Sequence, residues 1–277
     1  MTDDLIVEKI RHTTVFTINR PERLNALGGT VLTDLTAGIK EFQADPGQYV
    51  AIITGTGTRA FSSGADLKEM AGQVPDGAGL PLAASPDMCG LGSCNKVTIA
   101  AVNGLAVAGG LALCISCDIR IASDRAWFAL PEVRHGILAG RALTALPRLL
   151  PFGTVADLML TGDGLDAQNA LRLGLVQQVV PQHAVLAAAV EKADTIARNS
   201  PAAVWGTKQV LNMWRNFLSA ETHNYYQAIA HQVFGSGDVI EGSRAFAEKR
   251  QPEFVQAWPG TAARGIANGR AGERQTW

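Results

Sequence analysis

Residues 101–118 read A-V-N-G-L-A-V-A-G-G-L-A-L-C-I-S-C-D, which joins two apolar runs through a turn of small residues. The apolar run over 97–102 predicts a buried strand, and a helix is expected to begin after Ala108-Gly109-Gly110. Glycine lets a backbone N–H approach a ligand closely, and a helix start adds unpaired N–H groups and a positive dipole end. The pattern predicts donors aimed at developing negative charge, with Glu132 in F-A-L-P-E as the best candidate for a carboxylate facing them.

The apolar stretch 97–121 is long enough to suggest a membrane-spanning helix. A spanning helix needs about 20 continuous apolar residues. Here Asn103 and three glycines interrupt the run, and Asp118 and Arg120 lie in its second half. A buried strand, turn and helix is therefore favoured, and core packing without a catalytic role is its plainest interpretation.

Composition and charge exclude several classes of protein. The 277 residues are 47% hydrophobic and 18% charged, which is typical of a globular chain with a large core. A net charge of −1 gives no electrostatic footprint for nucleic acid or an anionic membrane, so neither is expected as a partner. The first ten residues lack a basic segment followed by an apolar one, so no signal peptide is expected and a cytoplasmic location is the default.

Four cysteines allow zinc binding, a redox pair or buried thiols as interpretations. Cys114 and Cys117 form C-x-x-C inside the apolar run, where a free cysteine behaves as a small hydrophobic residue. The histidines show no metal-binding spacing such as H-E-x-x-H. Buried thiols are therefore favoured, and no metal site is expected.

The rest of the chain alternates between short apolar runs and amphipathic stretches, which predicts an α/β fold. A helix is expected over 31–42, a short helix is expected to start at Ala65, and 72–85 is expected to be a loop. From about Pro201 onward the pattern is helical throughout. The predicted strands are 5–10, 14–19, 50–54, 97–102, 118–122 and 176–180.

One motif imitates a dinucleotide site. Residues 55–60 fit G-x-G-x-x-A after a predicted strand, but that site requires a helix directly after the glycines. The loop-like F-S-S-G follows instead, so nicotinamide and flavin binding are not expected. The chain also lacks a G-x-S-x-G elbow and a Walker A motif.

Seven segments in order resemble the crotonase superfamily of enoyl-CoA hydratases and isomerases. The resemblance implies a spiral of β-β-α units over 1–200 that binds acyl-CoA, and a C-terminal helical trimerisation region over 201–277. It implies an acyl-CoA thioester substrate, no cofactor apart from the substrate's coenzyme A, and a homotrimer or dimer of trimers. The segments are N-R-P-E-R-L-N-A-L (19–27), F-S-S-G-A-D-L-K-E-M (61–70), A-V-N-G-L-A-V-A-G-G (101–110), C-D-I-R-I-A (117–122), F-A-L-P-E (128–132), L-T-G-D (160–163) and A-F-A-E-K-R (245–250).

The same resemblance assigns site residues. The backbone N–H groups of Ala65 and Gly109 match the oxyanion hole that stabilises a thioester enolate, and Glu132 matches the acid/base. Phe246 and Lys249 match tail positions that reach the coenzyme A of a neighbouring subunit. Without the motifs, Arg23, Lys68 and Lys249 would be interpreted as plain surface charge. The remaining positions assigned to substrate or coenzyme A are Arg23, Leu24, Ala26, Ser63, Asp66, Leu67, Lys68, Gly110, Ala112, Pro131 and Gly140.

Two departures from the family pattern bear on the reaction. By this resemblance, classical hydratases carry two catalytic glutamates, and the first lies three residues after the oxyanion glycine. Ala112 stands at that position here, which leaves Glu132 as the single catalytic carboxylate. One group suffices for a 1,3-proton shift, whereas hydration needs water activation as well as protonation. The turn after P-E carries Arg141, and Arg134, His135 and Arg141 have no assigned role. Isomerase-like chemistry is favoured; the alternatives are a thioester hydrolase, a carbon–carbon bond-cleaving enzyme or a catalytically weak acyl-CoA-binding subunit.

Overall fold

The computed structural model describes residues 4–66, 69, 87–217, 219–235 and 238–254. Its main element is a six-stranded sheet in the order β1-β2-β3-β5-β7-β10. β1 is antiparallel to β2, and the remaining neighbours are parallel. All six predicted strands are confirmed, with bounds that shift by up to two residues. They are β1 (Leu5–Ile10), β2 (Thr13–Ile18), β3 (Val50–Gly55), β5 (Val97–Val102), β7 (Ile119–Ser123) and β10 (Gln178–Val180).

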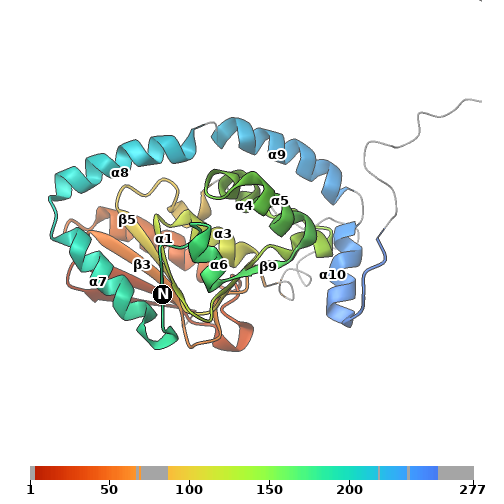
Figure 1. The fold of residues 1–277 in the computed structure, drawn as a ribbon, viewed down its shortest axis with the longest axis horizontal. Coiled ribbons are helices and arrows are strands. Elements are labelled where there is room, and N and C mark those ends of the chain that lie inside the picture. Colours follow the sequence, from red (N-terminus) through yellow and green to blue (C-terminus); the bar gives the residue numbers. More distant parts are fainter. Residues whose placement is uncertain (1–3, 67–68, 70–86, 218, 236–237, 255–277) are drawn as a thin grey trace, which may run out of the picture.

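The central strands are buried on both faces, which is why they read as continuous apolar runs. Alternate side chains of β3 point to opposite faces: Ile53 joins the core under α1 (Val31–Ala44), whereas Ile52 joins the core under α7 (Val185–Ala197). Figure 1 shows α7 lying along the large sheet. The helix predicted over 31–42 is thus confirmed and extends by two residues.

A second sheet of four very short strands lies beside the first, and the sequence analysis did not predict it. Its order is β4-β6-β8-β9, with β4, β6 and β8 parallel and β9 antiparallel to β8. Because β4, β6 and β8 are parallel, the segments that follow them emerge at the same edge of the sheet. The strands are β4 (Ala60–Ser62), β6 (Leu105–Val107), β8 (Trp127–Ala129) and β9 (Gly164–Asp166).

Helices cover the sheets, and the chain is helical in all described segments from Pro201 to Glu248 apart from short connections, as predicted. Figure 1 shows α8 and α9 running over the core, with α10 at one end of the molecule. Besides α7, the described α-helices after β6 are α3 (Gly109–Ser116), α4 (Gly140–Ala145), α5 (Phe152–Thr161), α6 (Ala167–Arg172), α8 (Pro201–Asn216), α9 (Ser219–Phe234) and α10 (Asp238–Glu248). The short 3-10 helices are η1 (Pro21–Arg23), η2 (Met88–Gly90), η3 (Pro131–His135), η4 (Leu146–Arg148) and η5 (Gln182–Ala184).

The apolar stretch 97–121 is divided among β5, β6, α3 and the start of β7. Within the described ranges, no helix has the length and hydropathy needed to cross a membrane. The helix predicted to start at Ala65 is wrong at that end, since Ala65 lies in a bend and Asp66 is not helical either. The loop predicted over 72–85 lies outside the described residues, as do Leu67 and Lys68.

The four cysteines are free and buried, as the apolar sequence around them predicts. Burial raises the pKa of the Cys89 thiol to about 11 and that of Cys114 to about 12, so both are protonated and unreactive near neutrality. In the part of the chain that the structure describes, no group of three or more His, Cys, Asp or Glu side chains is placed to hold a metal ion.

A buried charge cluster joins α8 to the large sheet. Lys208 is 4% exposed, and its ammonium pairs with Asp118 just before β7. Arg215 donates to the other oxygen of Asp118 at 2.9 Å, and the backbone N–H of Thr98 donates to the same carboxylate at 2.9 Å. A buried ammonium requires such partners, so this cluster ties the C-terminal helices to the core.

Candidate active site

Two backbone N–H groups come together where β4 and β6 end. A Cβ atom built on Gly64 would lie 2.8 Å from the nitrogen of Gly109, and one built on Gly109 would lie 3.6 Å from the nitrogen of Ala65. Within the described residues, no backbone hydrogen bond uses the N–H of Ala65 or of Gly109. The structure thus places the backbones of the two predicted oxyanion donors side by side.

The turn that presents Gly109 has an unusual backbone conformation. Ala108 has φ 52° and ψ −124°, a region that residues with a side chain rarely occupy. Its N–H donates to the carbonyl of Ala129 at 2.9 Å, and its carbonyl accepts from Ala112 at 3.0 Å. These bonds hold the turn, and Gly109 becomes the first residue of α3, at the positive end of the helix dipole. Such strain is typical of functional sites.

Gly110 explains how closely α3 approaches β4. A Cβ atom at Gly110 would lie 2.1 Å from the carbonyl oxygen of Ser62, so a side chain does not fit there. The Ser62 hydroxyl also accepts the N–H of Gly64 at 3.2 Å. Gly110 thus sets the spacing between the two donor loops, because it lets α3 rest directly on the β4 backbone.

Glu132 follows β8 at the same edge of the second sheet, in the first turn of η3 after Pro131. Its Oε2 atom is buried and has no hydrogen-bond partner among the described residues. Burial raises the pKa of the Glu132 carboxyl to about 7, while a hydrogen bond from its own backbone N–H acts in the opposite direction. A carboxyl group with a pKa near the working pH is suited to both accepting and returning a proton.

No second carboxylate occupies the first turn of α3. Ala112 lies there, three residues after Gly109, and is 4% exposed. Of the described carboxyl groups with a clearly shifted pKa, Glu132 alone is raised; those of Asp45, Glu69 and Glu241 are lowered. The first turn of α3 thus carries Ala112 where the family pattern has a glutamate, and no carboxylate lies in that turn.

Five of the residues predicted to contact coenzyme A lie on two paired segments. The N–H of Ser63 donates to the carbonyl of Leu24 at 3.0 Å, and the N–H of Leu27 donates to the carbonyl of Gly64 at 2.7 Å. These bonds bring the η1 segment against the loop that carries Ala65. The five residues are Arg23, Leu24, Ala26, Ser63 and Asp66.

Arg20 is central to this region, and the sequence analysis did not identify it. Its buried guanidinium pairs with Glu69 and lies 3.4 Å from Asp66, which is itself 6% exposed. Arg23 also reaches Asp66, at 3.8 Å, but its side chain is 42% exposed. Asp66 thus anchors the loop through arginines, while Arg23 remains open to a ligand. The N-R-P-E-R motif was the available signal, since it carries both arginines.

Of the two C-terminal residues predicted to reach the coenzyme A of a neighbouring subunit, Phe246 lies against the Glu132 segment of its own chain. The ring of Phe246 in α10 meets the ring of His135 edge-on, with centroids 5.4 Å apart. Lys249 follows α10 and is exposed. Gly140 begins α4, so the predicted turn at 140–143 is in fact helical.

The polar residues without an assigned role have structural partners. Arg134 donates to Asp163 at 2.5 Å and to the carbonyl of Thr161 at 3.0 Å. The Nε of Arg141 donates to the hydroxyl of Ser116 at 3.0 Å, at the C-terminal end of α3 where cations are favourable. Burial and the charge of Arg134 lower the pKa of His135.

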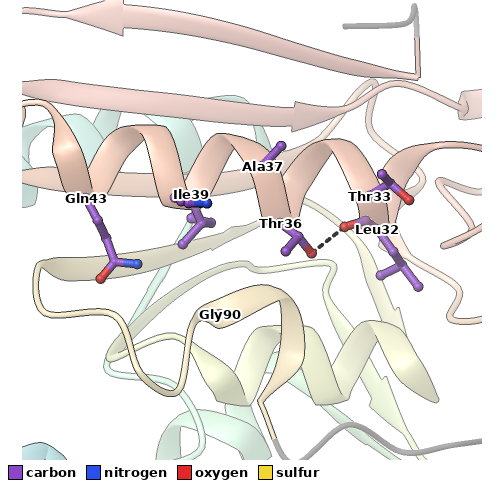
Figure 2. A pocket seen from close by; sticks show the side chains of 8 residues that line it. Leu32, Thr33, Thr36, Ala37, Ile39, Gln43 and Gly90 are labelled. Carbon is purple, nitrogen blue, oxygen red and sulfur yellow. Dashed lines mark hydrogen bonds between the residues drawn. The ribbon is translucent and has the colours of Figure 1, made fainter.

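A groove of about 560 Å³ is lined by α1 and by Gly90 of η2. In Figure 2 the side chains of Leu32, Ile39 and Gln43 point toward the Gly90 segment, whereas that of Ala37 points away from it. Thr36 in this groove donates to the carbonyl of Leu32 at 2.6 Å. None of the predicted site residues lines it. The predicted oxyanion donors and Glu132 lie instead at the ends of β4, β6 and β8.

Comparisons with known proteins agree with this arrangement. A family model described as enoyl-CoA hydratase/isomerase matches residues 10–257. The chain is 37% identical over 258 residues to a probable enoyl-CoA hydratase of Mycobacterium bovis, covering 91% of this chain and 98% of that protein. It is 38% identical over 248 residues to a carnitinyl-CoA dehydratase of Salmonella arizonae, covering 86% and 93%.

Solved structures support the fold as well. A carnitinyl-CoA hydratase from Mycobacterium avium is similar with a TM-score of 0.80 and 34% sequence identity, and the match covers 92% of this chain and 99% of that one. The fold expected from the sequence motifs is thus confirmed. The chain belongs to the enoyl-CoA hydratase/isomerase family of enzymes, in the crotonase superfamily.

Proposed function

We propose that the protein binds an acyl-CoA thioester and moves a proton at the acyl chain through an enolate, with Glu132 as the acid/base. The observation that carries this proposal is the Glu132 carboxyl, with a buried Oε2 atom and a pKa of about 7, at the sheet edge where the N–H groups of Ala65 and Gly109 make no backbone hydrogen bond within the described residues. Relatives named for enoyl-CoA and carnitinyl-CoA support a CoA thioester as the substrate. Coenzyme A enters as part of the substrate, and no separate cofactor is proposed.

In this mechanism the thioester oxygen accepts hydrogen bonds from the N–H groups of Ala65 and Gly109. As Glu132 removes a proton from the acyl chain, negative charge develops on that oxygen, and the two donors stabilise it. One such donor is worth about 3–4 kcal/mol of the activation barrier. Because the donors are fixed by the Ala108 turn and the Gly64 contact, little reorganisation is needed when the charge forms.

The absence of a carboxylate at Ala112 favours isomerisation or proton exchange over efficient hydration. Glu132 can take a proton from one carbon and return it to another, because its pKa lies near neutrality. Hydration requires a base for water and an acid for the α-carbon at the same time. Three assays test whether proton transfer is faster than hydration. They measure α-proton exchange in D₂O, 3-enoyl-CoA isomerisation and crotonyl-CoA hydration.

We further propose that Arg23, the Ser63–Asp66 loop and the positions 67–68 line the coenzyme A groove. Arg23 is an exposed cation and suits a phosphate, whereas Ala26 is buried and suits the apolar part of the groove. Phe246 and Lys249 complete the proposed ligand contacts from the C-terminal region. Gly110, Pro131 and Gly140 are proposed to shape the acyl pocket through the backbone.

Binding is expected to stabilise the protein against heat. Acetoacetyl-CoA at about 100 times its dissociation constant should add about 2.7 kcal/mol to the free energy of unfolding, because it binds only the folded state. Thermal unfolding with and without ligand measures this, and Arg23→Ala should weaken the effect. Arg198→Ala, which removes an exposed charge at the C-terminal end of α7, is the control. A complete lack of stabilisation by any acyl-CoA at millimolar concentration would refute the assignment.

We propose a homotrimer or a dimer of trimers. The helix α8 and its C-cap residue expose six large apolar side chains between 56% and 68%, more than a surface helix in a monomer needs. Light scattering should give a mass well above the 29.2 kDa of one chain, and Trp214→Glu should reduce it. Lys192→Glu on α7 is the control, and a monomeric wild type would contradict the proposal. The six exposed apolar side chains of α8 and its C-cap are Trp205, Val210, Leu211, Met213, Trp214 and Phe217.

A further inference from the structure

The helix α10 rests directly on the backbone of the segment that carries Glu132. A Cβ atom at Gly242 in α10 would lie 2.2 Å from the carbonyl oxygen of His135. In the other direction, a Cβ atom at Gly136 would lie 2.6 Å from the carbonyl group of Asp238, at the start of α10. Two glycines therefore allow a contact between α10 and η3 that no side chain would permit.

Side chains from both C-terminal helices close the same region. Phe246 of α10 packs edge-on against His135, as described above. Tyr226 of α9 is 6% exposed, although Tyr225 beside it is 71% exposed. α9 packs against α10 and α4, and burial together with the charge of Glu132 raises the pKa of the Tyr226 hydroxyl.

The charged and titratable groups around Glu132 do not neutralise it. On its own segment, Arg134 is paired with Asp163, and His135 has a lowered pKa. From α9 comes the neutral Tyr226 hydroxyl, and from α10 comes Asp238 at the Gly136 contact. No described residue forms an ion pair with Glu132, so its environment is set by the exclusion of water rather than by a counter-charge.

We propose that α9 and α10 form a wall that shields Glu132 from water and holds its turn in place, with Tyr226 and Gly242 as positioning residues. The C-terminal helices would then act on the chemistry of the same chain in addition to any role in assembly. This inference rests on the proposed role of Glu132 in proton transfer, but the property it predicts is one of the carboxyl group itself and is measurable without turnover.

The test compares two matched pairs of variants. Gly242→Ala adds a methyl group where the His135 carbonyl lies, whereas Gly206→Ala adds the same group in α8, where nothing lies within 4 Å. Tyr226→Ala opens the buried side of α9, whereas Tyr225→Ala removes an exposed ring. The ionisation of Glu132 is followed by ¹³C NMR of labelled glutamate carboxyls, with Glu132→Gln identifying the resonance.

Gly242→Ala and Tyr226→Ala are each expected to move the Glu132 midpoint from about 7 toward its ordinary value of 4.5, by one pH unit or more. Proton abstraction uses the ionised carboxylate, so the acidic limb of the exchange rate should shift to lower pH by the same amount. A shift of one unit is a tenfold change in the proton-binding constant. The two control variants should leave the midpoint at the wild-type value.

The outcomes separate this inference from the proposed function. An unchanged midpoint of Glu132 ionisation in folded Gly242→Ala and Tyr226→Ala proteins would overturn the proposal that α9 and α10 shield Glu132. If Gly242→Ala does not fold, the result for Tyr226→Ala alone decides. A midpoint that falls equally in the control variants would also overturn it, because the shift would then be unspecific. If the midpoint moves as expected but the protein shows no turnover on any acyl-CoA, the result would support the shielding of Glu132 by α9 and α10 and refute the proposed reaction.

Discussion

Glu132→Gln is expected to lower α-proton exchange and isomerisation by about 10²–10⁴-fold, the usual contribution of a general acid/base. Glutamine keeps the size of the side chain but neither takes up nor returns a proton. The substrate should still bind, since the Ala65 and Gly109 donors and the Arg23 region are untouched. Exchange of acyl-CoA protons in D₂O measures the loss, and thermal unfolding with the same ligand measures retained binding.

Glu8→Gln is the matched control, because Glu8 lies exposed on β1, far along the chain from the site. It should leave the exchange rate at the wild-type value. A Glu132→Gln enzyme that retains more than about a tenth of the wild-type rate would contradict the role of Glu132, because the loss would fall below the range of acid/base catalysis.

The pKa of Glu132 also predicts how the wild type responds to pH. Exchange should fall below about pH 7 as the carboxylate becomes protonated, by about tenfold for each unit. The folded state binds this proton more tightly than the unfolded state does. Protonated Glu132 therefore favours folding at low pH, and that contribution is lost as the pH rises through 4.5 to about 7.

The large sheet was predictable because its central strands are buried on both faces. Runs such as V-A-I-I-T and V-T-I-A-A-V have few other stable structures available. The second sheet was not predictable, because each strand contributes only three residues and periodicity needs a longer window. Yet those short strands place the Ala65, Gly109 and Glu132 segments at one edge. The motifs named the residues, but only the pairing of β4, β6 and β8 explains why they meet.

The environment of Glu132 was beyond the reach of sequence patterns for a similar reason. The shielding proposed above involves Tyr226 and Gly242, which lie about a hundred positions later on two other helices. Helical spacing does not single out these residues, since Tyr225 and Tyr226 are adjacent and differ only in which one faces the core. Arg20 was also missed, because a buried arginine resembles a surface arginine until its partners are placed.

Ala112→Glu is expected to raise crotonyl-CoA hydration by about 10²–10⁴-fold relative to proton exchange, if a second carboxylate supplies the missing acid/base step. The position lies in the first turn of α3, where the helix dipole favours a negative charge. Ala112→Gln is the control, because it adds nearly the same volume without an ionisable group. The ratio of the two rates is measured for each variant with the same substrate.

The comparison with the wild type decides whether the missing glutamate matters. Ala112 is buried, so both larger side chains displace their neighbours, and an effect shared by glutamate and glutamine reflects packing alone. A gain confined to Ala112→Glu would show that the scaffold retains the geometry for hydration and lacks only the second carboxylate. A wild type that hydrates crotonyl-CoA at about 10–10³ per second, the range of ordinary efficient enzymes, would show that another group activates water. The single-carboxylate mechanism would then be wrong, and so would the preference for isomerisation that is inferred from it.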